Sequence, residues 1–100
     1  MKLYVLVRED LSHAQRAVQG GHAIAEFLRL HPNTEWNYGS LVFLGGMRDE
    51  EQLRAWMEEI EYEDAPRACF KEPYWNHSLT AFAILGTELV QQIFKELPLL

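Results

Sequence analysis

Short apolar runs alternate with helix-like segments along this 100-residue chain, and this alternation limits the folds that it can adopt. Four apolar runs predict strands, namely residues 2–7, 40–44, 67–70 and 80–85. Three segments carry apolar residues at helical spacing and predict helices, namely residues 12–30, 49–60 and 87–94. Strands that alternate with helices favour a mostly parallel sheet with helices on both faces. We therefore expect a single α/β domain over residues 1–100.

The composition fits a packed domain in a reducing compartment, with hydrophobic residues at 48% and charged residues at 24%. Cys69 is the single cysteine, so an internal disulfide and a zinc site built from cysteines are excluded. No apolar run approaches the roughly 20 residues that span a bilayer. The start, MKLYVLVRED, is too short and too soon charged for a secretory signal. We expect a cytoplasmic protein with no membrane contact.

The formal net charge is −6, from 15 acidic and nine basic residues. Broad nucleic-acid binding relies on lysines and arginines that neutralise phosphates, so this charge argues against it. The acidic residues cluster within residues 49–64, which leaves the rest of the chain closer to neutral. A local basic patch stays open as an alternative, but nine basic residues leave little to build it from.

The first predicted helix begins at a capping box formed by Ser12 and Gln15 and ends before Pro32. It contains Gly20 and Gly21, each of which costs a helix interior about 1 kcal/mol relative to alanine. Small and apolar residues share one side and predict the buried face, namely Ala14, Ala17, Val18, Gly21, Ala25 and Leu28. In this arrangement Gly21 permits close packing on the sheet, and Gly20 keeps the surface beside Gln19 open.

A polar stripe runs along the same helix through Gln15, Gln19, His22 and Glu26. At about 100° per residue, the four side chains lie within an arc of roughly 60°. Two interpretations of this stripe remain open. It is either a solvated helix face or a surface that forms hydrogen bonds with a ligand.

The opening of the chain resembles a known family through a strand, an Asp-Leu pair and a helix with a Gln-x-x-His-Ala motif. The matching residues are Asp10, Leu11, Ala17, Val18, Gln19, His22 and Ala23. In these features residues 2–27 resemble the type II peptidyl-tRNA hydrolases, which cleave the ester between a peptide and the 3′ end of transfer RNA. The resemblance implies a three-layer α/β/α sandwich around a four-stranded mixed sheet whose last strand is antiparallel.

The resemblance also implies where the site should lie, although two family positions differ here. The family uses a lysine at the helix start, where this chain has Gln15, and an aspartate loop after the third strand. The segment KEPYWN, residues 71–76, replaces that loop, so Glu72 would supply the acid and Lys71 the cation. The expected catalytic residues are Gln19, His22, Glu72 and Thr80. The expected substrate-binding residues are Asp10, Gln15, Lys71, Tyr74, Trp75 and Asn76.

Two functions stay open at this point, and neither requires a cofactor or a metal. One is hydrolysis of a peptidyl-tRNA or a similar ester, and the other is a binding module for a nucleotide, an RNA end or a protein. Histidines 13, 22 and 31 are each nine residues apart, which is not a metal-ligand spacing. The loop aromatics would stack on a base, cover core edges or form a homodimer contact, and they are Trp36, Tyr38, Tyr74 and Trp75.

Overall fold

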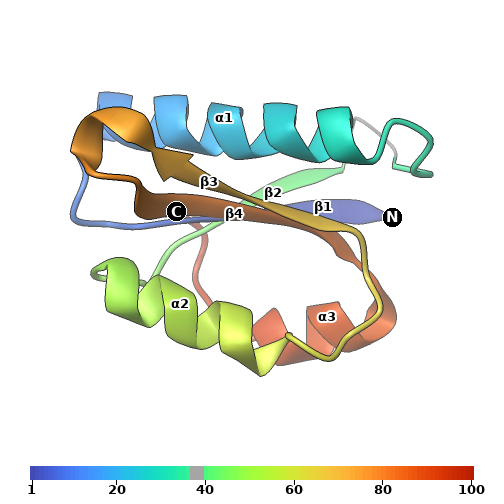
Figure 1. Ribbon diagram of the computed structural model, residues 1–100. Helices are drawn as coiled ribbons and strands as arrows, with labels where there is room; N and C mark the ends of the chain where they lie inside the picture. The colour runs from blue at the N-terminus through green and yellow to red at the C-terminus, as the bar shows by residue number, and fades with distance from the viewer. Residues whose placement is uncertain (37–39) are drawn as a thin grey trace.

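The computed structural model describes residues 1–36 and 40–100, and it is a three-layer α/β/α sandwich (Figure 1). Its strands are β1 (Lys2–Val7), β2 (Leu41–Leu44), β3 (Arg67–Glu72) and β4 (Ser78–Gly86). Its helices are α1 (His13–Leu30), α2 (Glu50–Glu59) and α3 (Glu88–Phe94), and a 3₁₀ turn spans Pro73–Trp75. Helix α1 covers one face of the sheet, and α2 and α3 cover the other. Tyr38 lies outside the described residues.

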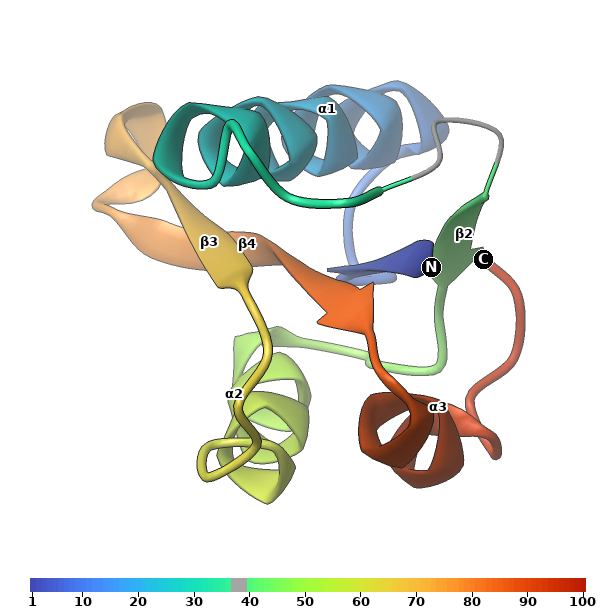
Figure 2. The ribbon, with the colours of Figure 1, turned by 90° about the vertical axis from the view of Figure 1, so that its right-hand side faces the viewer.

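The sheet has the order β2-β1-β4-β3 (Figure 2). β1 and β2 pair in parallel, whereas β4 lies between β1 and β3 and runs antiparallel to both. This confirms a mixed sheet with an antiparallel last strand. Among the described strands, one neighbouring pair is parallel and the other two are antiparallel. The prediction of a mostly parallel sheet is therefore wrong. The reason is the short connection between β3 and β4, since consecutive strands joined by so few residues pair antiparallel.

Both faces of the central strands are buried, because helices lie on each side. On β1, Leu3, Val5 and Val7 pack toward α1 with Phe27. The alternate residues Tyr4 and Leu6 pack toward α2 and α3. Strands buried on both faces read as continuous apolar runs, which is why the sequence of β1 shows no alternation. Among the described residues, no helix has both the length and the apolarity needed to cross a membrane.

The buried face of α1 differs from the predicted stripe of small residues. The helix begins at the predicted capping box of Ser12 and Gln15, but its buried residues are Gln19, Gly20, Ala23 and Phe27. Ala14, Ala17, Val18, Gly21 and Ala25 are exposed instead, and Leu28 is half-buried. Because burial free energy scales with apolar area, the phenyl ring of Phe27 decides which face turns inward, and a row of alanines does not.

The two adjacent glycines have the opposite roles to those predicted. Gly20 faces the sheet, where an added Cβ would lie 2.7 Å from Cε2 of Phe43 and 3.4 Å from Cγ2 of Val7. Gly21 has nothing within 4 Å of that position. The close approach of α1 to the sheet therefore depends on Gly20. Gly21 is exposed and has no packing role.

Candidate functional site

A cavity of about 410 Å³ lies between α1 and the connection from β3 to β4. Eight residues line it, namely Ala14, Gln15, Val18, Gln19, His22, Glu72, Tyr74 and Trp75. Six of the ten site residues expected from the sequence are among them. Glu72 is the last residue of β3 and the 3₁₀ turn follows it, so both lie at the carboxyl end of a strand, which is where ligands bind in open α/β sheets.

A chain of hydrogen bonds joins three elements beneath this cavity. Thr80 Oγ1 on β4 donates to Gln19 Oε1 on α1 at 2.6 Å, and Gln19 Nε2 donates to Glu72 Oε2 on β3 at 3.0 Å. Thr80 is 0% exposed, Gln19 3% and Glu72 7%. A buried amide that satisfies both its oxygen and its nitrogen is fixed in orientation, so it holds the Glu72 carboxylate in one position.

A β-bulge turns Thr80 toward α1. The pairing of β3 with β4 shifts between Phe70 and Lys71, because Phe70 is opposite Ala81 and Lys71 is opposite Leu79. Thr80 is therefore an extra residue on β4, and it shares the α1 face with its neighbour Ala81. Bulges commonly re-aim a side chain beside a functional site. Thr80 lies under Gln19 and does not line the cavity, so it can only position other residues.

Glu72 also begins the 3₁₀ turn that forms the far wall of the cavity. The backbone N–H of Tyr74 donates to Glu72 Oε1 at 3.4 Å, and the N–H of His77 donates to the Glu72 carbonyl at 3.0 Å. Asn76 and His77 both have left-handed backbones, with φ of 57° and 58°. This tight turn leaves the Tyr74 side chain 93% exposed at the cavity rim.

His22 and Gln15 complete the helix side of the cavity. The His22 ring stacks on Phe70, with centroids 4.3 Å apart and an interplanar angle of 11°. Gln15 Oε1 accepts from the Ser12 N–H in the capping box, which leaves the Nε2 group to donate to a ligand. Three residues of the polar stripe therefore line the cavity, namely Gln15, Gln19 and His22. The fourth, Glu26, does not, and it forms an ion pair with Arg29 at 2.9 Å.

Three of the expected binding residues do not line the cavity. Asp10 forms an ion pair with Arg8 at 2.6 Å, and this cation lowers the pKa of the Asp10 carboxyl. Lys71 lies between Phe70 and Glu72 on β3, so strand alternation directs it to the opposite face from Glu72. Asn76 is exposed in the turn. The structure therefore does not bring the cation expected from Lys71 to this carboxylate.

Sequence analysis did not find Glu50, which fixes the start of β4 from the other side. Glu50 Oε1 accepts from Ser78 Oγ at 3.0 Å, and Oε2 accepts from the Leu79 N–H at 2.9 Å. The bond from Leu79, with further bonds from Arg54 and Ser78, lowers the pKa of Glu50 to about 2. Its only sequence signal was an acid in the first turn of α2, which any helix N-terminus favours.

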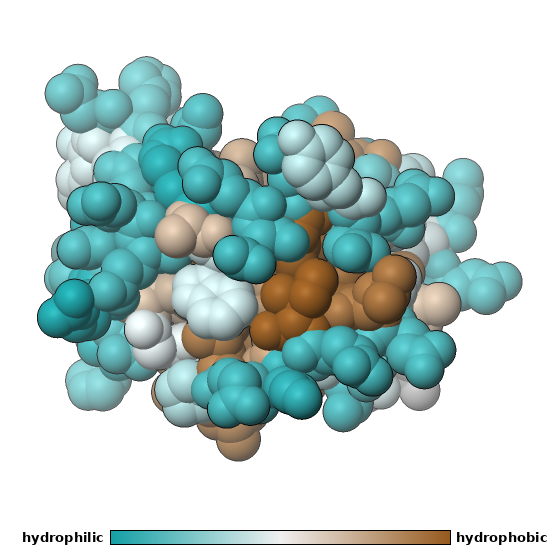
Figure 3. All heavy atoms as spheres, turned by 90° about the horizontal axis from the view of Figure 1, so that it is seen from below, coloured by the Kyte–Doolittle hydropathy of each residue, from teal (hydrophilic) through white to brown (hydrophobic). Residues whose placement is uncertain are grey.

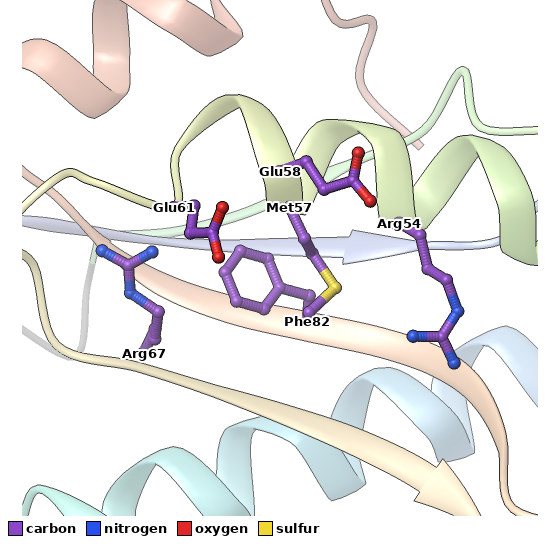
Figure 4. A pocket seen from close by; sticks show the side chains of 6 residues that line it. All are labelled: Arg54, Met57, Glu58, Glu61, Arg67 and Phe82. Atoms are coloured by element: carbon purple, nitrogen blue, oxygen red, sulfur yellow. The ribbon is translucent and has the colours of Figure 1, made fainter.

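A second hollow of about 340 Å³ lies between α2 and the sheet, and its lining residues are Arg54, Met57, Glu58, Glu61, Arg67 and Phe82 (Figure 4). Its two arginines lie at opposite ends, and both are bound within the chain. Arg54 pairs with Glu50, and Arg67 donates to backbone carbonyls of Ile60, Glu63 and Ala65. These contacts hold the end of α2 against β3, so we assign this hollow a structural role.

Within residues 1–36 and 40–100, no group of three or more His, Cys, Asp or Glu side chains could hold a metal ion. His22 and Glu72 both line the cavity and are of metal-ligating types. Two ligands alone do not make a metal site, because zinc and similar ions need three or four. The chemistry available to this cavity is therefore that of a fixed carboxylate beside an imidazole, an amide and two aromatic rings.

Comparison with known proteins shows the fold class and no family. No family model matches the chain, and no curated protein sequence matches it. The chain is similar to the solved structure of a protein of unknown function from Agrobacterium tumefaciens, with a TM-score of 0.72 and 13% sequence identity. The similarity covers 99% of this chain and 96% of that one. At this identity the likeness shows a shared α/β architecture over the whole domain and nothing about activity.

Proposed function

We propose that this chain is a small hydrolase that cleaves an ester at the 3′ end of transfer RNA, as the type II peptidyl-tRNA hydrolases do. The observation that carries the proposal is the Glu72 carboxylate, which Gln19 fixes at the wall of the cavity. The resemblance of residues 2–27 to that family supplies the substrate class. The free thiol of Cys69 and a tRNA substrate both fit a cytoplasmic protein.

Glu72 would act as the general base. Each of its carboxylate oxygens accepts one hydrogen bond from the protein and keeps a lone pair for a water molecule. Glu72 takes a proton from this water as the oxygen attacks the ester carbonyl carbon. The tetrahedral intermediate then expels the 3′ oxygen, which receives the proton back from Glu72. The products are a free carboxylic acid and a tRNA with a 3′ hydroxyl.

The other cavity residues would bind and orient the substrate. The free Nε2 group of Gln15 can donate to the carbonyl oxygen as negative charge develops there. His22 offers ring nitrogens on the same helix face, one turn beyond Val18. The exposed ring of Tyr74 and its neighbour Trp75 would stack on the terminal base. Thr80 has a positioning role through Gln19.

The test is hydrolysis of a peptidyl-tRNA by the purified chain and its Glu72→Gln variant. Loss of the base should lower turnover by about 10²-fold or more. Glu35→Gln is the matched control, since it makes the same chemical change at an exposed residue outside the cavity. His22→Ala measures the contribution of the imidazole. Equal turnover by the wild-type chain and Glu72→Gln, with both folded, would remove the role of Glu72.

A second candidate function is a binding module without turnover. It is favoured by the absence of lysine and arginine from the described residues that line the cavity. In the type II peptidyl-tRNA hydrolases, a lysine supplies positive charge to the reaction. This candidate predicts that deacylated tRNA binds and that peptidyl-tRNA binds without being cleaved. Tyr74→Ala or Trp75→Ala should then weaken binding in a fluorescence anisotropy titration, and normal binding by both variants would exclude this loop as the site.

A further inference from the structure

Negative charge in this protein is concentrated on the side of the sheet that carries α2 and α3. Residues 49–64 and 87–100 contain ten acidic and two basic side chains, a net charge of −8. The rest of the chain contains five acidic and seven basic side chains, a net charge of +2. The helices that these segments contain, α2 and α3, lie on the face of the sheet opposite α1 (Figure 1, Figure 2). The net charge of −6 is therefore distributed very unevenly between the two sides of the molecule.

An apolar groove of about 460 Å³ crosses this acidic side between α2 and α3. Ala55, Trp56, Glu59 and Ile93 line it. Trp56 and Ile93 are half-buried and pack on the core, and the rings of Trp56 and Phe94 pack edge to face with their centroids 6.0 Å apart. One turn before Ile93 on α3, Leu89 is 60% exposed. Viewed from this side, apolar and aromatic surface forms a continuous patch bordered by hydrophilic side chains (Figure 3).

Apart from Glu50, the carboxylates on α2 and α3 form no ion pair within the described parts of the chain. Among these residues the ion pairs are those of Asp10, Glu26 and Glu50. Glu59 in the groove wall and the exposed Glu51 and Glu88 on the same two helices have no basic partner there. Apolar surface on a side whose unpaired charge is predominantly negative is complementary to a partner with apolar side chains and positive charge.

We propose that the groove between α2 and α3 is a docking surface for a cationic amphipathic segment of a partner protein. Its apolar side chains would enter the groove beside Trp56, Ile93 and Leu89, as an amphipathic helix fills a hydrophobic groove. Its lysines or arginines would face Glu59 and Glu88. This surface and the Glu72 cavity lie on opposite faces of the sheet, so the inference is independent of the proposed function.

The test uses a fluorescein-labelled 14-residue peptide of leucine and lysine, with the leucines at helical spacing. Anisotropy should show saturable binding of one peptide per chain. A peptide with glutamate in place of lysine should bind at least tenfold more weakly. Binding of the lysine peptide should weaken as salt rises, because salt screens the exposed carboxylates. Absence of saturable binding by the lysine peptide would overturn the proposal.

Matched variants separate the groove from general charge attraction. Leu89→Ser and Glu59→Lys should each weaken binding at least fivefold. Leu30→Ser, at a 50% exposed leucine on α1, and Glu35→Lys, with the same charge change elsewhere, should change it less than twofold. Equal weakening by Glu35→Lys and Glu59→Lys would show attraction by net charge alone and overturn the proposal. All four sites are exposed, and thermal unfolding checks each fold.

A second copy of the chain is the main competing occupant. Sedimentation velocity of the chain alone should show a monomer, or a dimer that Leu89→Ser does not affect. A dimer that Leu89→Ser dissociates would assign the groove to self-association and overturn the proposed partner.

Discussion

The side-chain amide of Gln19 donates a hydrogen bond to the carboxylate of Glu72, 53 residues further along the chain, at 3.0 Å. The two residues come from α1 and β3, and both are almost fully buried. The bond makes one cavity wall from two distant segments.

Gln19→Ala should lower the free energy of unfolding by about 1–3 kcal/mol, because it removes bonding partners from the buried groups of Thr80 and Glu72. Urea denaturation measures the change. Gln92→Ala is the control, since it removes the same amide from an exposed position on α3. Equal stability of the two variants would show that the buried network contributes nothing to folding.

Thr80→Val should impair the candidate site without touching a ligand. Valine keeps the shape of threonine but cannot donate to Gln19, so the orientation of Glu72 is less well fixed. We expect kcat, or ligand affinity if the protein only binds, to fall severalfold, while Thr80→Ser restores it. For a catalyst, a change confined to KM would contradict a positioning role. Failure of serine to rescue would point to packing of the methyl group instead.

The two glycines of α1 should respond oppositely to alanine. Gly20→Ala should lower the free energy of unfolding by about 1 kcal/mol or more, because its Cβ meets the packed Phe43 ring at 2.7 Å. Gly21→Ala should raise it by about 0.5–1 kcal/mol, because the position is open and alanine favours the helix. Thermal unfolding of both variants provides the comparison. A Gly20→Ala variant as stable as Gly21→Ala would contradict the close approach of α1 to the sheet.

Stability should rise with pH across the titration of Glu50. Its pKa is lowered from 4.5 to about 2 in the folded chain, so its contribution is complete above pH 4.5 and is lost as pH falls toward 2. Glu50→Gln should remove this part of the pH dependence in urea denaturation between pH 2.5 and 6. Glu51→Gln, at the exposed neighbour without an ion pair among the described residues, is the control and should retain it. The same profile for Glu50→Gln and the wild-type chain would disprove the role of Glu50.

Much of the candidate site could be predicted, because its residues lie in recognisable local contexts. Gln19 and His22 stand out as an amide and an imidazole on a helix face where lysine and glutamate are commoner, and Glu72, Tyr74 and Trp75 follow a predicted strand. The same segment predicts Lys71 and Asn76 as binding residues, but neither lines the cavity. Their placement depends on where β3 ends and how the turn closes, and β3 extends two residues further than its apolar run.

The amino-acid sequence alone determined the order of elements, the α/β class and the capped start of α1, because these depend on local propensity and hydrophobic periodicity. The tertiary structure decided which face of α1 is buried, since alanine and glycine have too little apolar area to fix it and Phe27 packs only against an assembled sheet. It also decided the bulge at Thr80 and the contacts of Glu50 with Ser78 and Leu79. Those features arise from pairing between distant segments. The local sequence pattern does not determine the register of that pairing or how closely the segments approach.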